Sequence, residues 1–381
     1  MKKEGELRNQ LKAVRTRLGI SQQELAATAG VARQTIGGIE AGTYALSLTV
    51  ALHLAKALGC AVEELFWLDG DLPTVEATLT RPAATDRTPD SVRVALAHIG
   101  GRWIASPLTG EQAFRQEMVP ADGIGTWDAG KRAFSVQMLD TPDALAQTVM
   151  LAGCTPALSL WARSTERWHP GLRVHWLHAN STDALALLAQ GYVHIAGIHL
   201  FDLRTGEDNA AFVRKALPGV PTALVNLGSW EEGFLVAPSN PKRLQNVADL
   251  TQKDVRLVNR EPGAGSRLLL DSLLERDGIP ASAVAGYDHI ARGHRDVARE
   301  IQSGNADIGV STAGVAATYG LPFLPLHSVR YDLALRQESL KIPAVQQLLS
   351  TLHHRWVRSQ LATLGGYDIT RTGESVEVQA A

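Results

Sequence analysis

The sequence predicts a multidomain chain in which a small all-α head precedes a β-rich segment and a larger α/β domain. Three observations support this prediction. Apolar residues recur at helical spacing near the N-terminus, a Pro- and Thr-rich stretch follows, and strand–loop–helix units recur from residue 147 onward. The 381 residues suffice for two or three domains. We expect a head at residues 1–68, a linker at 69–90, a β-rich segment at 91–146 and the α/β domain at 147–381.

The composition is typical of a globular protein with large cores, because 45% of the residues are hydrophobic. The net charge of −2 argues against a protein that coats nucleic acid indiscriminately, but residues 2–33 hold seven Lys or Arg against three Asp or Glu. No apolar run has the length of a membrane span, and no signal-peptide pattern opens the chain. With Cys60 and Cys154 as the only cysteines, we expect a cytoplasmic chain with no disulfide framework and no membrane partner.

The head is predicted from a helix-turn-helix pattern. Residues 6–18 favour a first helix, and a capping box at Ser21 and Glu24 opens a second helix that ends at Gly30, where a turn tolerates positive φ. The next helix has its own apolar stripe, and its outward residues can meet base edges and phosphates in a major groove. The candidate DNA-contacting residues are Arg15, Arg17, Gln22, Arg33, Gln34, Thr35 and Gly38. An ordinary helical hairpin with a solvated polar face is the alternative.

The residues "RTRLGISQQELAATAGVARQTIGGIEAG" and "SLTVALHLAKALGCAVEELF" make residues 6–68 similar to the Xre/Cro-type repressor family. The resemblance implies double-stranded operator DNA as a partner. Gly37 and Gly38 depart from the family's larger polar residues and cost on the order of 2 kcal/mol of helix propensity. Because operators are commonly palindromic and one small head buries little surface, a homodimer is expected.

The residues between the head and the α/β domain fall into two parts. "RPAATDRTPDS" indicates a linker, and "SVRVALAH" followed by Gly100, Gly101 and "RWIASPL" predicts a β-hairpin. "KRAFSVQML" predicts another strand of the same small sheet. We assign no chemistry to this segment.

The remainder alternates strands with helices, which predicts α/β layers with largely parallel strands. The polar tail after residue 365 is expected to be frayed. In such folds a ligand lies beyond the carboxyl ends of the strands, where helix N-termini offer free N–H groups to an anion. The candidate ligand-binding residues are Thr155, Ser181, Thr182, His199, Glu261, Gly263, Gly265, Ser266, Arg267, His294, Thr312 and Tyr331. Any single such loop is as well explained by helix capping, and it is their recurrence that favours a ligand site.

Three segments, "ANSTDALALLAQGYVHIAGIHL", "NREPGAGSRLLLD" and "HRDVAREIQSGNADIGVSTAGVAATYGLPFLPLHSVRYDLAL", make residues 147–345 similar to the periplasmic-binding-protein-like domain found in the cytoplasm. The resemblance implies a type II arrangement of two α/β lobes, joined by crossing strands near 225–238 and 322–327, with the ligand in the cleft. Relatives are described as molybdate-binding, so molybdate or tungstate is the effector that the resemblance implies. Sulfate, phosphate, a small acid or a larger polar metabolite would suit the same loops.

These observations predict a one-component transcriptional regulator whose α/β domain senses a small ligand. No recognisable nucleophile turn appears, and the spacing of His169, His175 and His178 does not fit a helical zinc pair, so no catalytic residue, metal site or cofactor is assigned. A contact from the Cys154 thiol to a ligand or oxidant is a minor alternative. Two alternatives to the regulator remain: an enzyme or ligand-binding protein of molybdenum-cofactor metabolism with an autoregulatory head, and a DNA-bound scaffold with a vestigial cleft.

Overall fold

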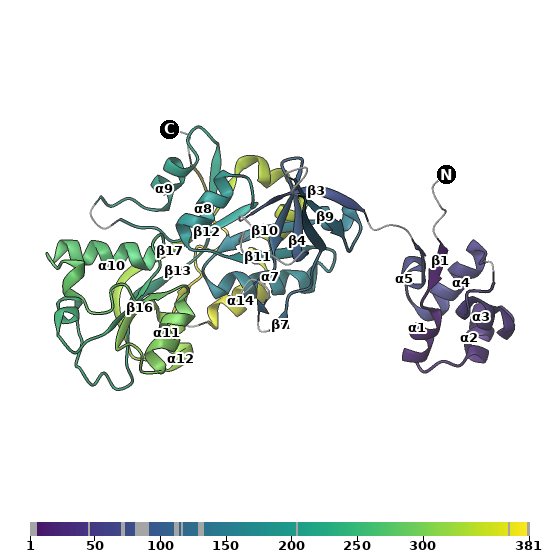
Figure 1. The fold of residues 1–381 in the computed structure, drawn as a ribbon, viewed down its shortest axis with the longest axis horizontal. Coiled ribbons are helices and arrows are strands. Elements are labelled where there is room, and N and C mark those ends of the chain that lie inside the picture. Colours follow the sequence, from purple (N-terminus) through teal and green to yellow (C-terminus); the bar gives the residue numbers. More distant parts are fainter. Residues whose placement is uncertain are drawn as a thin grey trace. The chain divides into compact units, whose positions relative to one another are not determined.

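The computed structural model describes residues 6–44, 46–69, 73–80, 91–109, 114–115, 117–128, 133–202, 205–364 and 366–378. The chain forms two compact units, Met1–Leu72 and Pro73–Ala381 (Figure 1). Each unit has a hydrophobic core of its own. No helix in the described ranges is both long enough and apolar enough to cross a bilayer.

The first unit is the predicted helical head, closed by a small β-ribbon. Leu11, Leu25, Ile36, Leu54 and Leu65 are fully buried and form its centre. Its elements are β1 (Glu6–Asn9), α1 (Leu11–Arg17), α2 (Gln22–Ala29), α3 (Arg33–Glu40), α4 (Leu48–Leu58), α5 (Val62–Leu65) and β2 (Phe66–Asp69).

The prediction of one helix over residues 6–18 was wrong at its start. Glu6–Asn9 instead pairs antiparallel with Phe66–Asp69, a partner that local helical spacing cannot reveal. The side chain of Asn9 then accepts from the Leu11 amide at 3.3 Å, which satisfies one of the free N–H groups at the start of α1.

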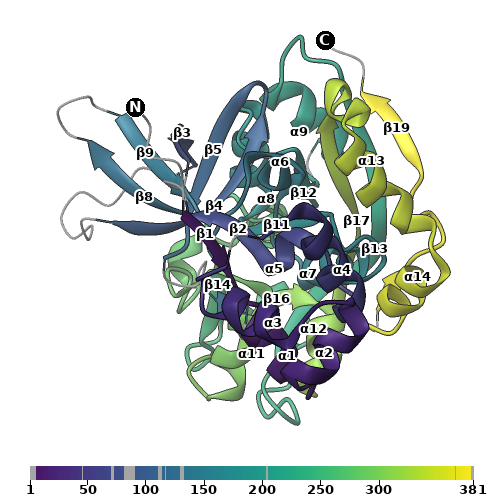
Figure 2. The same ribbon diagram turned by 90° about the vertical axis from the view of Figure 1, so that its right-hand side faces the viewer.

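The second unit begins with a closed barrel, visible in Figure 2, whose strand order is β3-β5-β4-β8-β9. The hairpin is confirmed, with Gly100 and Gly101 at φ 58° and 78° in its turn. The linker predicted at residues 69–90 was too long, because Thr74–Leu79 forms a strand that pairs with two barrel strands. Residues 81–90 of that linker lie outside the described ranges. The elements here are β3 (Thr74–Leu79), β4 (Val92–Ile99), β5 (Arg102–Pro107), β6 (Phe114–Arg115), β7 (Glu117–Met118), β8 (Gly123–Asp128), β9 (Ala133–Met138) and α6 (Pro142–Ala146).

The barrel is part of the α/β domain rather than a separate module. Ala97, Ile99 and Ile104 of its hairpin pack into the same core cluster as Met150 and Leu185. The β-rich segment therefore supports one side of the central sheet.

The central sheet has ten strands, and its main path is β11-β10-β12-β17-β13-β16-β14-β15. The outer pairs are parallel, as predicted. Lobe 1 contains β10 (Thr148–Gly153), α7 (Pro156–Trp168), β11 (Arg173–His178), α8 (Ser181–Ala189), β12 (Ile195–Ile198), α9 (Asn209–Ala216), α13 (Pro343–Ser350) and α14 (Arg355–Ala362). Lobe 2 contains β14 (Leu257–Arg260), α10 (Gly265–Arg276), β15 (Ile290–Ala291), α11 (His294–Gln302), β16 (Ile308–Thr312) and α12 (Ala313–Tyr319), with short 3₁₀ turns at Val247–Thr251 and Ala281–Ala283; two more, Gln337–Lys341 and Thr351–His353, flank α13.

Two long strands join the lobes. β13 (Thr222–Val236) and β17 (Phe323–Arg336) pair antiparallel along their length, which confirms the crossing strands. Their register shifts twice, between Asn226 and Gly228 and between Glu232 and Gly233. Such irregularities bend a strand locally.

The expectation of a frayed tail was wrong for the described residues. β18 (Tyr367–Asp368) and β19 (Ser375–Val378) both pair with β13, and Val378 is buried. Backbone pairing with a crossing strand therefore forms strands in a segment whose polar sequence alone predicts no regular structure.

Candidate functional sites

The helix-turn-helix pair has the local chemistry that its sequence predicts. Ser21 Oγ accepts from the Glu24 amide at 3.2 Å while the Glu24 carboxylate accepts from the Ser21 amide at 2.7 Å, and Gly30 ends α2 at φ 68°. On α3, Arg33 and Gln34 are exposed and Thr35 is half-buried. A Cβ at Gly38 would lie 3.1 Å from the Tyr44 Cβ, so glycine allows the following turn to pack closely against α3.

Two of the candidate DNA-contacting residues converge on Glu40. Arg15 Nε donates to Glu40 Oε1 at 2.6 Å, and Gln22 Nε2 donates to Glu40 Oε2 at 2.8 Å. Burial acts to raise the pKa of Glu40, but these hydrogen bonds outweigh it and the pKa is lowered. Arg15 and Gln22 therefore connect α1, α2 and α3, whereas Arg17 is exposed.

The second candidate site lies where the two lobes meet. The Thr182 amide in α8 donates to the Gly263 carbonyl at 3.2 Å, and Asn180 Nδ2 donates to the Pro262 carbonyl at 3.4 Å. Gly265, which begins α10, lies so close to lobe 1 that a Cβ there would be 2.1 Å from the His199 carbonyl oxygen. Gly263 has φ 90°, and a Cβ there would lie 3.0 Å from Asn180 Oδ1 and 3.1 Å from the Thr182 Cβ. The lobes are thus in contact, and the groups between them are buried.

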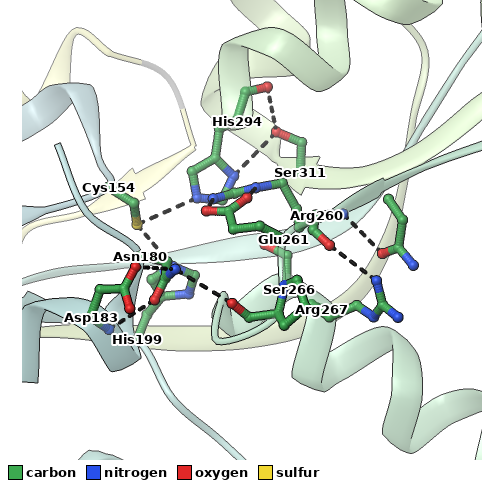
Figure 3. A network of polar contacts seen from close by, with 12 residues as sticks. Cys154, Asn180, Asp183, His199, Arg260, Glu261, Ser266, Arg267, His294 and Ser311 are labelled. Carbon is green, nitrogen blue, oxygen red and sulfur yellow. Dashed lines mark hydrogen bonds and ion pairs between the residues drawn. The ribbon is translucent and has the colours of Figure 1, made fainter. Parts of the chain in front are cut away.

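A thiol and two imidazoles meet at the centre of this interface (Figure 3). Cys154 Sγ lies 3.2 Å from His199 Nε2 and 3.8 Å from His294 Nε2, and all three side chains are buried. Burial raises the pKa of Cys154 to about 12, against the opposing effect of the Arg260 charge. Burial and the same charge lower the pKa of His199 to about 3, and the pKa of His294 is lowered well below its usual value for the same reasons. Both shifts favour the neutral form of the imidazole.

Glu232 of the crossing strand β13 reaches the same centre. Its Oε1 lies 3.2 Å from His199 Nδ1 and accepts from Ser266 Oγ at 2.8 Å. Burial raises the pKa of Glu232 to about 7, although the Ser266 hydrogen bond and the Arg260 charge oppose the shift. A side chain from the strand that connects the lobes therefore contacts both of them.

Arg260 is the buried cation of the site. Its Nε and Nη2 each donate to Glu261 over 3.0 Å, a bidentate pair, and only 1% of its side chain is exposed. Its Nη1 has no hydrogen-bond partner among the described residues, and neither has the indole nitrogen of buried Trp230. A buried donor without an acceptor is costly, so Arg260 Nη1 is available to an acceptor that a ligand would bring.

The structure brings five of the predicted ligand-binding residues to this centre: His199, Glu261, Ser266, His294 and Tyr331. The Tyr331 ring stacks on His199 with centroids 5.7 Å apart, and a Cβ at Gly153 or Gly197 would lie within 2.5 Å of its hydroxyl oxygen.

The other predicted side chains are engaged within the protein. Thr155 contacts the Tyr367 hydroxyl at 2.9 Å, Ser181 accepts from the His199 amide at 3.2 Å, and Thr312 caps α12. Arg267 pairs with Asp271 at 3.0 Å and stacks over Tyr287, so its guanidinium is held on α10. The buried arginine of the site is Arg260 instead.

Sequence reasoning missed Arg260, Glu232 and the central place of Cys154. A usable signal existed for two of them, since Cys154 follows β10 directly and Arg260 ends β14, where α/β folds place their ligands. Glu232 lies within a long strand, and no local pattern distinguishes it.

Comparisons with known proteins agree with this architecture. A helix-turn-helix family model (HTH_3) matches residues 11–65, and the model of the PBP superfamily domain (PBP_like) matches residues 162–353, just over half of the chain. The uncharacterized protein YvgK of Bacillus subtilis (strain 168) is 33% identical over 200 residues, which cover 52% of this chain and 64% of YvgK, less than two thirds of its length. The uncharacterized HTH-type transcriptional regulator YgzD of the same strain is 44% identical over 63 residues, 16% of this chain and 96% of YgzD.

Among solved structures, an ABC-type phosphate transport receptor from Vibrio cholerae matches with 14% identity and a TM-score of 0.41, covering 58% of this chain and 99% of that one. The sulfate-binding protein SubI from Mycobacterium tuberculosis H37Rv matches with 18% identity and the same TM-score, covering 58% and 86%. From the family models and the two-lobed sheet, we conclude that the chain belongs to the PBP superfamily and carries a helix-turn-helix domain ahead of its PBP-like domain.

Proposed function

We propose that the chain is a one-component transcriptional regulator that binds operator DNA as a homodimer and changes its DNA affinity when a small ligand binds between the lobes of its PBP-like domain. The helix-turn-helix match and the relative named as an HTH-type transcriptional regulator support the DNA-binding half. Arg33, Gln34, Thr35 and Gly38 of α3 are the proposed groove contacts, with Arg17 on the phosphates.

The observation that carries the ligand-binding half is the buried, unfilled donor of Arg260. Its Nη1 and the Trp230 indole nitrogen have no acceptor among the described residues. Arg260 ends β14 of lobe 2, and Trp230 lies in the crossing strand β13 with its ring 5.6 Å from that of His199. An oxyanion supplies several acceptor oxygens in a small volume. The resemblance of this domain to relatives described as molybdate-binding makes molybdate and tungstate the first candidates, and sulfate, phosphate and small carboxylates suit the same donors.

Closure provides the switch. Backbone contacts such as Thr182 to Gly263 form only when the lobes meet, so a ligand that binds both lobes favours the closed state. The regulatory output then depends on how much more tightly the closed state holds the ligand.

The test measures ligand and DNA binding by the full chain. Operator duplexes are selected from a random pool, and DNA affinity is measured with and without molybdate, tungstate, sulfate, phosphate and small acids. Thermal unfolding is followed in parallel, because a ligand at a hundred times its Kd stabilises the folded state by about 2.7 kcal/mol. We expect one compound to stabilise the protein and to change DNA affinity.

Matched variants locate the effect. Arg260→Gln should abolish the ligand response and keep basal DNA binding, whereas Arg276→Gln, an exposed arginine at the end of α10, should leave both unchanged. A ligand response that survives in Arg260→Gln would contradict the site. If the selection yields no bound duplex at any ligand concentration, the proposal that the chain is a transcriptional regulator is contradicted.

A further inference from the structure

We propose that Cys154, His199 and His294 form a binding site for a transition-metal ion of the zinc class, held between the two lobes. The inference goes beyond the oxyanion proposed above by adding a metal ion as a second ligand of the interlobe site, and its regulatory meaning rests on the proposed function. It depends on four features: the spacing of the ligand atoms, the partners of the outer imidazole nitrogens, the charges nearby and the origin of the ligands in both lobes.

The three ligand atoms already lie at coordinating distances from one another. The sulfur is 3.2 Å and 3.8 Å from the two Nε2 atoms, and all three atoms lie within 4.8 Å of one another. Zinc bond lengths of about 2.3 Å to sulfur and 2.0 Å to nitrogen, in tetrahedral geometry, place sulfur and nitrogen about 3.5 Å apart. The observed separations bracket that value, so an ion can enter with small side-chain shifts.

Each histidine is oriented as a metal ligand. Both rings have Nε2 near the sulfur and Nδ1 near an oxygen: His294 Nδ1 contacts Ser311 Oγ at 3.4 Å, and His199 Nδ1 lies 3.2 Å from Glu232 Oε1 without the geometry of a hydrogen bond. Metal-bound histidines in general use the outer nitrogen to contact a carboxylate, carbonyl or hydroxyl group, which fixes the ring and raises its basicity.

The charges suit a soft divalent cation. A bound ion would displace the proton of the Cys154 thiol, so that the sulfur coordinates as a thiolate, and Glu261 pairs with the nearby Arg260. One sulfur and two imidazoles select zinc, cobalt or copper over magnesium or calcium, which prefer oxygen. Arg260 Nη1 and the Trp230 indole nitrogen are not among the three proposed ligand atoms, so a bound ion leaves both donors available to an anion.

The ligands come from both lobes. Cys154 and His199 follow β10 and β12 of lobe 1, and His294 begins α11 of lobe 2. An ion bound to all three therefore holds the lobes together. Because the three side chains are buried in the closed state, the ion must enter when the lobes open.

The experiment titrates the full chain, stripped with a chelator, with Co²⁺ alone and follows the thiolate-to-cobalt charge-transfer band. The chain offers a matched control, because Cys60 is its only other cysteine and lies in the head. We expect one cobalt per chain, a band that is lost in Cys154→Ser and kept in Cys60→Ser, and displacement by Zn²⁺. A band that is absent from the wild type, kept in Cys154→Ser or lost in Cys60→Ser would overturn the site.

A second variant covers the case in which Cys154→Ser fails to fold, as judged by circular dichroism. His294→Gln keeps the thiol and His199, and should weaken Zn²⁺ binding at least tenfold in a competition assay. Unchanged affinity would overturn the site. Stoichiometric metal binding with DNA affinity unaffected by Zn²⁺ would uphold the metal site while contradicting its part in the proposed regulation.

Discussion

The backbone amide of Thr182 donates to the carbonyl oxygen of Gly263 over 3.2 Å, and this hydrogen bond joins lobe 1 to lobe 2. The contact is made by main-chain atoms, so replacing a side chain does not remove it. Close approach depends instead on glycine: Gly265 sits against the His199 carbonyl with no space for a methyl group. Steric substitution is therefore the way to separate closure from ligand chemistry.

Gly265→Ala should hold the lobes apart. The added methyl group would meet the His199 carbonyl oxygen at 2.1 Å, and relieving such overpacking costs about 1–3 kcal/mol. We expect ligand affinity to fall roughly tenfold to a hundredfold, measured by calorimetry with the ligand identified in the anion and metal assays. Gly171→Ala is the control, since nothing lies within 4 Å of its Cβ. Equal affinities in the two variants would show that closure does not contribute to binding.

Arg33→Ala combined with Gln34→Ala should remove specific DNA recognition. Both side chains are exposed on α3, and one good base contact contributes about 1–3 kcal/mol of discrimination. We expect operator affinity to approach that for random duplex in a fluorescence anisotropy assay, with ligand binding unchanged. His53→Ala, exposed on α4, serves as the control. If the double variant still prefers the operator to random duplex, a helix other than α3 must contact the bases.

Arg15 and Arg17 both belong to α1, but we expect Arg15 to contribute to the stability of the head and Arg17 to contribute to DNA binding. Arg15→Ala removes the pair with Glu40 and leaves that half-buried carboxylate without its cation, which should destabilise the head by about 1–2 kcal/mol. Arg17→Ala should leave stability unchanged and reduce the salt dependence of DNA binding by about one phosphate contact. Urea unfolding and salt titrations separate the two effects. Equal stability of the two variants would contradict the structural role of Arg15.

His194 should make the second unit sensitive to acid. Its Nδ1 accepts from the Met150 amide at 3.0 Å, and burial lowers its pKa to about 4. Since the unfolded residue binds a proton near pH 6.5 and the folded one does not, stability falls as the pH drops from about 6.5 toward 4. Between pH 7 and pH 5 the loss from this residue is about 2 kcal/mol.

His194→Asn keeps an acceptor for the Met150 amide but cannot titrate. The difference in unfolding free energy between pH 7 and pH 5, measured by urea titration, should therefore be about 2 kcal/mol smaller in this variant than in the wild type. An unchanged pH dependence would show that His194 is protonated in the folded state.

Local chemistry determined which parts of the fold the sequence could predict. Ser21, Glu24 and Gly30 act on neighbours a few residues away, and the structure confirms the capping box and turn. Glu6–Asn9 was predicted as helix because its partner, Phe66–Asp69, is distant in the chain, and Thr74–Leu79 was assigned to a linker for the same reason. Pairing between distant strands overrides local patterns.

The same distinction applies to the interlobe site. Arg260 and Arg267 lie within eight residues of each other in the sequence. Arg260 pairs with Glu261 and is buried between the lobes, whereas Arg267 pairs with Asp271 on α10, and the sequence alone does not distinguish the two arginines. Cys154 and His294 are 140 residues apart and meet only because β13 and β17 hold the lobes together. Sequence reasoning identified the loops and some of the side chains that converge, among them His199 and His294, but it missed Arg260 and Glu232.

The register shift between Glu232 and Gly233 falls at the residue that contacts His199 and Ser266. One carboxylate therefore lies both at an irregularity of a connecting strand and at the centre of the interlobe site. Substitutions in the strands beside this bulge would change the energy difference between open and closed forms without touching any ligand atom. In the proposed regulator, such substitutions would shift the ligand concentration that closes the lobes while leaving the contacts to the ligand unchanged.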